Sequence, residues 1–227
     1  GKSLFSRIIA ALDRVELLNY ATEIEHCCAL SFLGKLSMDA AKTLIRMQTD
    51  LQIYKTMMSR ELNFRPSDMS SVFKDHNPAR YFERIFKPGD ELIPDIISKE
   101  KPILNLAVHN LLAFSEPIWQ GLGKRCVFVE VARHPLYMIR QNELNMQKLI
   151  GDARYFAIHF SYKNHDYPYY VWGWEDIFHI SNPMEQTIHF IDQYIKRRDI
   201  EKEKLKEKYQ AEIITIPFEL FVEISQY

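Results

Sequence analysis

The chain has 227 residues, of which 47% are hydrophobic and 26% are charged, and this composition is typical of a globular protein with a substantial core. Its 29 basic and 30 acidic residues almost cancel, so the net charge of −1 excludes a general electrostatic attraction for nucleic acid or for an anionic membrane. We expect a soluble protein, with the cytoplasm favoured, because no apolar run approaches the length of about eighteen residues that spans a bilayer.

The first residues, Gly1, Lys2 and Ser3, precede a helical pattern of apolar residues, as at the end of a phosphate-binding loop. In such a loop the lysine and the hydroxyl face the phosphates, and the helix supplies free N–H groups. A plain helix start or a tag remnant remains the alternative, because three residues often match by chance. The apolar segment 14–18 then predicts a strand, and we expect the chain to be truncated within the loop, without the strand upstream of it.

Residues 21–62 predict helices, and Ser37 is the expected N-cap of the clearest one. The three cysteines are the adjacent pair Cys27 and Cys28, inside an apolar run, and the single Cys126. They form neither a disulfide framework nor a CxxC metal pair, and we expect all three to be buried thiols.

Residues 63–78 are polar, contain two prolines and predict a loop. Two short helices are expected between 79 and 102. The apolar run 103–109 is of the kind that makes a buried parallel strand, and its last residue is His109.

Strand and helix patterns alternate in the rest of the chain, as they do in βαβαβ units. The predicted elements are helices over 111–122, 135–150 and 183–198 and strands over 126–132, 154–162 and 212–218. The charged run after the last helix, 199–209, predicts a solvated helix face. We therefore expect an α/β fold of three layers with a central, mainly parallel sheet of the P-loop nucleotide-binding type. It would form one domain over residues 1–227, with helical insertions.

An aromatic segment over 165–178 contains Tyr170, Trp172 and Trp174. Aromatic faces with polar edges suit sugar rings and planar molecules, so these three side chains are candidates for the wall of an acceptor site. Packing of a hairpin or loop onto the core is the alternative.

Two of the predicted strands end in residues that carry chemistry, the first in His109 and the second in Arg133. If these strands are parallel neighbours, both side chains point into the crevice beyond the carboxyl ends of the strands, where one anion could contact them and the opening loop. Arg133 could instead form an ion pair with Glu130. His109 could be a hydrogen-bonded strand-end residue, and His134 precedes a proline and predicts a turn.

The sequence "AVHNLL…EPIWQGLGKRCVFVEVARHPLYMI" resembles the middle of the sulfotransferases that use 3′-phosphoadenosine 5′-phosphosulfate. The resemblance implies that His109 is the catalytic base and that Arg133 binds the 3′-phosphate. It also implies that Gly1, Lys2 and Ser3 hold the 5′-phosphosulfate, with Lys2 stabilising the leaving phosphate. Where the family has a serine that shares the 3′-phosphate, this chain has Gln141. "IPFELF", residues 216–221, is similar to a late strand of the family.

The implied activity is transfer of a sulfuryl group to a hydroxyl or amine of a small-molecule or carbohydrate acceptor. A neutral histidine could accept the proton of the attacking group. No metal is expected, since the histidines lack metal-type spacing. Two alternatives stay open: a P-loop kinase or other nucleoside-triphosphate enzyme, which needs a carboxylate for Mg²⁺, and a non-catalytic relative that binds an anion or a protein.

Overall fold

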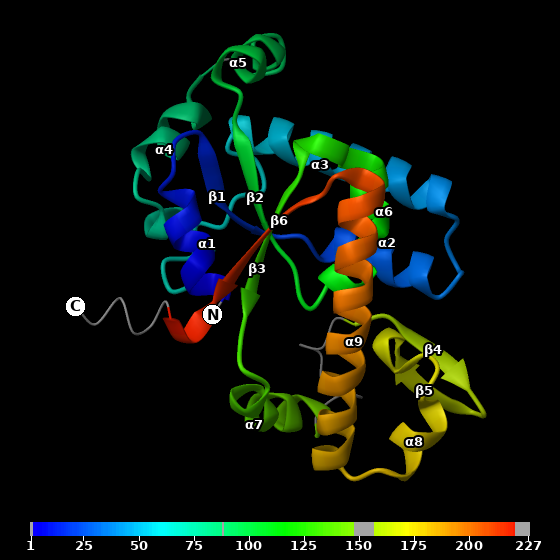
Figure 1. Ribbon diagram of the computed structural model, residues 1–227. Helices are drawn as coiled ribbons and strands as arrows, with labels where there is room; N and C mark the ends of the chain where they lie inside the picture. The colour runs from blue at the N-terminus through cyan, green and yellow to red at the C-terminus, as the bar shows by residue number, and fades with distance from the viewer. Residues whose placement is uncertain (1, 88, 148–156, 221–227) are drawn as a thin grey trace. The chain divides into compact units, whose positions relative to one another are not determined.

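A computed structural model describes residues 2–87, 89–147 and 157–220, and of residues 2 and 3 it describes the backbone (Figure 1). The chain divides into two compact units. The first unit comprises Gly1–Ala21 and Arg46–His109, and the second comprises Thr22–Ile45 and Asn110–Tyr227. The single domain expected over residues 1–227 stays a prediction.

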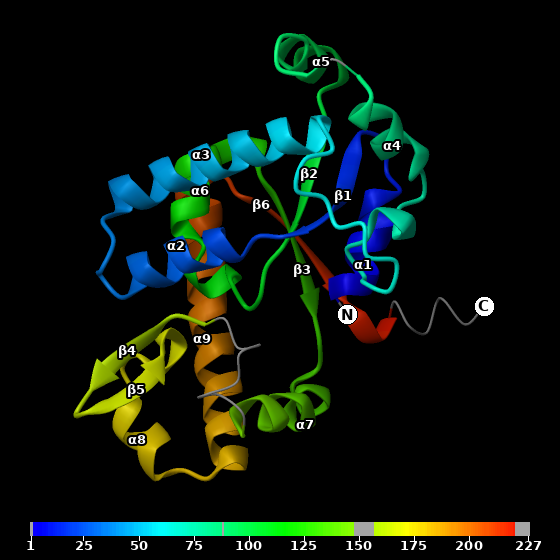
Figure 2. The ribbon, with the colours of Figure 1, turned by 180° about the vertical axis from the view of Figure 1, so that it is seen from behind.

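The first unit is built on a pair of parallel strands. Its elements are α1 (Lys2–Ala10), β1 (Val15–Tyr20), the C-terminal part of α3 (Met38–Met57), η1 (Val72–Lys74), α4 (Ala79–Ile85), α5 (Ile93–Glu100) and β2 (Ile103–Ala107). β1 pairs with β2, and α1 packs against both strands, as Figure 2 shows from behind. The helix after the opening tripeptide and the two strands of this unit are therefore confirmed.

Pairing in the first unit ends earlier than expected, because β2 stops at Ala107 and not at His109. The last backbone hydrogen bond runs from Ala21 N–H to the Ala107 carbonyl at 3.1 Å. The chain then turns, and Asn110 has a φ of 46°. His109 consequently lies beyond the strand and is exposed.

The second unit contains most of the helices. Its elements are α2 (Thr22–Phe32), the first part of α3, η2 (Leu112–Phe114), α6 (Glu116–Leu122), η3 (Gly123–Arg125), β3 (Val127–Ala132), α7 (Pro135–Met146), β4 (His159–Tyr162), β5 (His165–Pro168), η4 (Tyr169–Val171), α8 (Glu175–Ile180), α9 (Pro183–Tyr209) and β6 (Glu212–Pro217).

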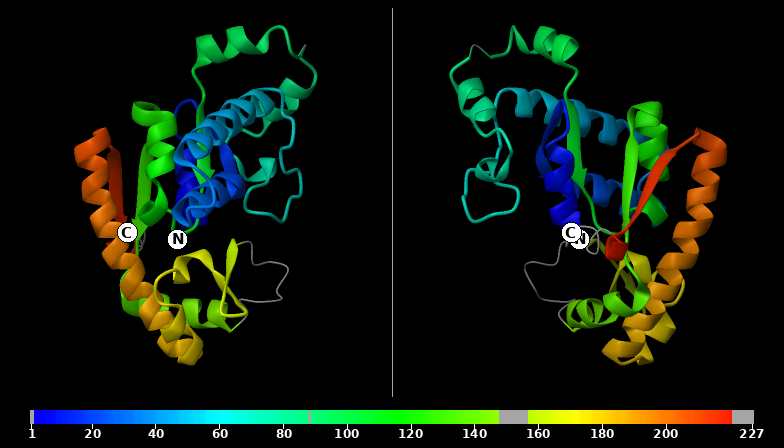
Figure 3. Two further views of the ribbon diagram at one scale, coloured as in Figure 1. Left: turned by 90° about the vertical axis from the view of Figure 1, so that its right-hand side faces the viewer. Right: turned by 60° about the vertical axis from the view of Figure 1, so that its left-hand side comes forward.

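The parallel pair of β3 and β6 is the scaffold of the second unit. The two strands are in continuous register from Val127 opposite Glu212 to Ala132 opposite Pro217. The C-terminal half of the long helix α9 lies beside this pair, as both views of Figure 3 show. Buried Leu205 of α9 packs there in a cluster with Leu112 and Trp119.

The local helix signals were largely correct. The Ser37 hydroxyl accepts a hydrogen bond from Ala40 N–H at 3.2 Å, as expected of an N-cap. Cys27 and Cys28 are buried, whereas Cys126 is half-buried, so the prediction for Cys126 was too strong. The charged run 199–209 is the last part of α9, and most of its residues are exposed, as expected of a solvated helix face, whereas Leu205 is fully buried.

The expected βαβαβ order was wrong at its third strand. β4 pairs antiparallel with β5 and forms a hairpin. The two turn residues, Lys163 and Asn164, have φ values of 48° and 65°, and positive φ at both positions is the geometry of a tight hairpin turn. Within the described ranges β2 also does not pair with β3, since β2 pairs with β1 and β3 pairs with β6.

The described residues thus form a mixed helix and strand structure with small parallel sheets. None of the helices in this part of the chain combines the length and the apolar character that a bilayer span requires.

Candidate functional site

Arg133 lies where two parallel strands end together. It directly follows β3, and Phe218 directly follows the partner strand β6. The guanidinium carbon of Arg133 lies 5.5 Å from the centre of the Phe218 ring. The main-chain N–H of His134 donates a hydrogen bond to Glu219 Oε1 at 3.0 Å. Residues 85 positions apart in the sequence are therefore joined at the carboxyl edge of this strand pair.

The alternative that Arg133 pairs with Glu130 is wrong. The Glu130 carboxylate is buried and contacts Lys202 Nζ at 2.9 Å, Arg198 Nη1 at 3.3 Å and the Thr215 hydroxyl at 2.8 Å. Among the residues that the structure describes, no carboxylate lies within ion-pair distance of Arg133. Its guanidinium is exposed, with one face near an aromatic ring, and its N–H groups remain available to an anion.

Glu219 is an acidic group at this edge, and its environment favours the ionised form. The hydrogen bond from His134 N–H lowers the pKa of Glu219, and the positive charge of Arg133 acts in the same direction. The similarity of "IPFELF" to a late strand of the sulfotransferases drew attention to this segment, but it did not predict which residues the segment contacts. Glu219 is a site residue that sequence reasoning missed.

The turn between β3 and α7 is fixed by local sequence. His134 is the N-cap of α7, and its Nδ1 accepts a hydrogen bond from Leu136 N–H at 3.3 Å. Pro135 occupies the first helical position, where its missing N–H costs nothing. The prediction of His134 as a turn residue is confirmed. Gln141 lies further along α7, is exposed and donates a hydrogen bond to Asn145 Oδ1 at 3.3 Å.

His109 belongs to the first unit, beyond the end of β2. Its imidazole is stacked with the ring of Tyr20 at the end of β1, with 6.5 Å between ring centres and 10° between ring planes. The adjacent Asn19 has a buried Nδ2 that finds no hydrogen-bond partner in the described residues. The carboxyl edge of β1 and β2 therefore presents polar side chains, as such edges do in ligand-binding α/β proteins. Asn19 was missed, although its place after a buried apolar run was a usable signal.

The opening tripeptide is described only in part. α1 begins at Lys2, which agrees with a helix that starts directly after the Gly-Lys-Ser sequence. Gly1 and the side chains of Lys2 and Ser3 lie outside the described residues, so their role in holding phosphate stays a prediction.

The three aromatic candidates differ in exposure. Trp174 is only 6% exposed, and its Nε1–H donates to the Tyr170 carbonyl at 3.0 Å. Tyr170 packs on Phe190 of α9 with 4.7 Å between ring centres. Trp172 is 43% exposed and meets Phe160 of β4 edge-on. Packing explains Trp174 and Tyr170, and Trp172 keeps a face that a ligand could reach.

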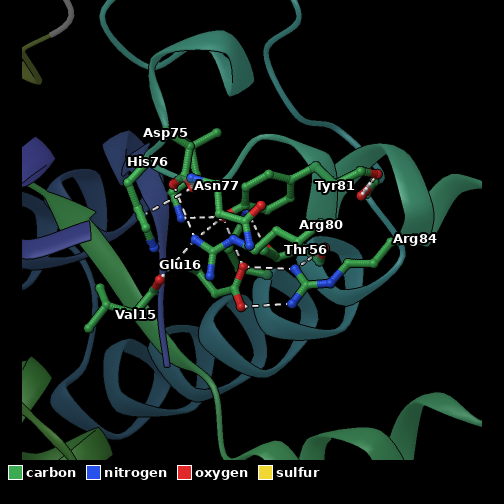
Figure 4. A network of polar contacts seen from close by, with 12 residues as sticks. Val15, Glu16, Thr56, Asp75, His76, Asn77, Arg80, Tyr81 and Arg84 are labelled. Carbon is green, nitrogen blue, oxygen red and sulfur yellow. Dashed lines mark hydrogen bonds and ion pairs between the residues drawn. The ribbon is translucent and has the colours of Figure 1, made fainter. Parts of the chain in front are cut away.

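A polar network in the first unit brings several charged groups together in a largely buried place (Figure 4). Arg84 forms a bidentate ion pair with Glu16, and Arg80 contacts Asp75 Oδ2 at 3.1 Å. The Tyr81 hydroxyl donates to Glu16 Oε2 at 3.0 Å and accepts from Leu17 N–H at 2.7 Å. Each carboxylate faces a guanidinium, so the charges of the network compensate one another, and the buried Nε of Arg80 is left without a hydrogen-bond partner among the described residues. We interpret it as the connection that holds α4 and the preceding loop to β1.

Within the described ranges, no three or more His, Cys, Asp or Glu side chains are grouped so that they could hold a metal ion. Comparisons with protein-family models, with curated proteins and with solved structures found no match to this chain.

Proposed function

We propose that the protein is a sulfotransferase that moves a sulfuryl group from 3′-phosphoadenosine 5′-phosphosulfate to a hydroxyl or amine of a small-molecule or carbohydrate acceptor. The observation that carries the proposal is Arg133, an exposed guanidinium at the carboxyl ends of two parallel strands with no carboxylate in ion-pair contact among the described residues. A planar guanidinium with free N–H groups suits a terminal phosphate, which it can bind through two parallel hydrogen bonds.

The proposed chemistry needs positioned charges and one base. The acceptor oxygen or nitrogen attacks sulfur, the bond between sulfur and the phosphate oxygen breaks, and adenosine 3′,5′-bisphosphate leaves. Lys2 and Ser3 would stabilise the charge on the leaving phosphate, and His109 would accept the proton of the attacking group. This assignment is supported by the place of His109 just beyond a parallel strand and by the helix that starts at Lys2.

The surroundings of Glu130 remove one carboxylate that the kinase alternative could use and leave it Glu219, at the carboxyl ends of β3 and β6. A kinase of this type needs a carboxylate near a strand end that is available to Mg²⁺. Glu130 is the acidic residue of β3, and Lys202 and Arg198 already neutralise it. The non-catalytic alternative draws its support from Gln141, whose side chain is longer than the serine that the family uses.

Thermal unfolding with nucleotides tests the proposal. Adenosine 3′,5′-bisphosphate should raise the unfolding temperature more than ATP with Mg²⁺ does, because a ligand that binds the folded state stabilises it. Arg133→Ala should weaken binding of the bisphosphate about 10- to 100-fold and leave binding of adenosine 5′-monophosphate within about twofold.

Lys124→Ala is the matched control, since Lys124 is an exposed cation at the opposite end of the same strand. It should leave both affinities unchanged. Equal weakening of both nucleotides by Arg133→Ala would contradict the assignment of the 3′-phosphate to this residue.

A further inference from the structure

Arg197 of α9 is held by aromatic rings from two other segments of the second unit. Its guanidinium carbon lies 4.6 Å from the ring centre of Phe32, the last residue of α2. The same carbon lies 5.4 Å from the ring centre of Phe114 in η2. The two rings meet edge to face with 4.7 Å between their centres. Tyr169 supports Phe114 from a further side, at 5.0 Å. The guanidinium therefore has a fixed place.

Arg197 differs from the basic residues around it on the same helix. Lys196 pairs with Asp192 at 2.8 Å, and Arg198 pairs with Asp199 at 2.7 Å and with Glu130. For Arg197, by contrast, no described residue offers a carboxylate in ion-pair contact or an acceptor for its N–H groups.

In this arrangement no anion among the described residues neutralises the guanidinium of Arg197. Aromatic rings attract a cation through their faces, but they do not accept the hydrogen bonds that the N–H groups of the guanidinium form in its own plane. Arg197 is half-buried, and burial lowers its pKa, which reflects the loss of water around the charge. A partly desolvated cation without an in-plane acceptor gains most from an oxyanion that completes its hydrogen bonds.

We infer that Arg197 binds a carboxylate or sulfate group of the acceptor, so that the protein prefers acceptors that already carry a negative charge. The assignment of the anion to the acceptor rests on the proposed function, whereas anion binding by Arg197 rests on the contacts above. Both kinds of oxyanion match the planar fork of N–H donors.

The experiment follows the Nε–Hε signal of Arg197 by NMR in the chain of 227 residues at constant ionic strength. Signals from Nε–Hε to the ring protons of Phe32 and Phe114 identify it in the native protein, and its absence in Arg197→Lys confirms the assignment. The probes are D-glucuronate, which carries a carboxylate and hydroxyl groups, its neutral amide D-glucuronamide, and inorganic sulfate.

We expect glucuronate to shift the Arg197 signal in a saturable way and glucuronamide to leave it in place. Arg197→Lys should weaken glucuronate binding about tenfold or more, because lysine keeps the charge but loses the planar fork. Lys196→Gln, which removes one charge from the adjacent position, should leave the affinity unchanged.

No saturable shift of the Arg197 signal, or equal shifts at all arginines, would overturn the inference. If sulfate but not glucuronate shifts the Arg197 signal in a saturable way, the assignment of the anion to the acceptor is overturned. Arg197 would then belong to a site for a free inorganic anion. Failure of the proposed function would give a different result. In that case adenosine 3′,5′-bisphosphate would not stabilise the protein, and the response of Arg197 to glucuronate would be unchanged.

Discussion

Arg84 donates two hydrogen bonds to the Glu16 carboxylate, from Nη1 to Oε2 at 2.8 Å and from Nη2 to Oε1 at 3.0 Å. Both side chains are largely buried, with exposed fractions of 11% for Arg84 and 2% for Glu16. The pair joins α4 to β1 inside the first unit. Loss of one partner would leave an uncompensated charge in the interior. This lowers the stability of the folded protein more than loss of both partners does.

We therefore expect Arg84→Met to lower the free energy of unfolding by about 3–5 kcal/mol. Glu16→Gln should have a smaller effect of the same sign, because the amide can still accept the hydrogen bond of Tyr81. The double variant should be less destabilised than the sum of the two single variants. Urea unfolding followed by circular dichroism measures all three, and strictly additive losses would show that the two groups do not interact.

His109→Gln should leave folding unchanged, because His109 is exposed and lies beyond the strand. If His109 is the base, turnover should fall about 10²- to 10⁴-fold. The measurement is release of adenosine 3′,5′-bisphosphate from 3′-phosphoadenosine 5′-phosphosulfate with a panel of hydroxyl and amine acceptors. His165→Gln, a change of the exposed histidine that opens β5, is the control. Unchanged turnover in His109→Gln would remove this residue from the mechanism.

The contacts of Glu116 predict that the protein loses part of its stability in acid. Burial acts to raise the pKa of Glu116, but hydrogen bonds from Lys204, Lys208 and Tyr209 outweigh it and lower the pKa to about 2. Because the pKa is lower in the folded than in the unfolded state, the stabilisation is complete above the unfolded pKa of about 4.3 and is lost as the pH falls towards 2.

The wild-type protein should accordingly be more stable than Glu116→Gln at pH 6, and the difference in unfolding temperature should narrow between about pH 4.5 and pH 2. Glu203→Gln is a suitable control, since Glu203 is 68% exposed and its pair with Lys206 is solvated. A difference between wild type and Glu116→Gln that stays constant over this pH range would refute the role of the three donors.

Several features followed from the sequence because they depend on neighbours a few residues apart. The cap at Ser37, the helix that begins at Ala79 and the turn at His134 and Pro135 are set by local hydrogen bonds and by the fixed φ of proline. The apolar runs that became β2, β3 and β6 were recognisable because the strands of parallel sheets are rich in apolar residues, although only Asn105, Ala107 and Glu130 of these three strands are buried.

Contacts between distant segments could be decided only by the tertiary structure. Glu130 and Arg133 are three residues apart, yet α9 supplies the cations for Glu130, and Arg133 meets Phe218 instead. Trp172 and Trp174 are two residues apart, yet one is exposed and the other is buried. Local patterns fix the type of an element, but the pairing of its side chains depends on which other elements pack against it. Arg197 has no motif of its own, and only the packing of Phe32 and Phe114 against it makes it a candidate site.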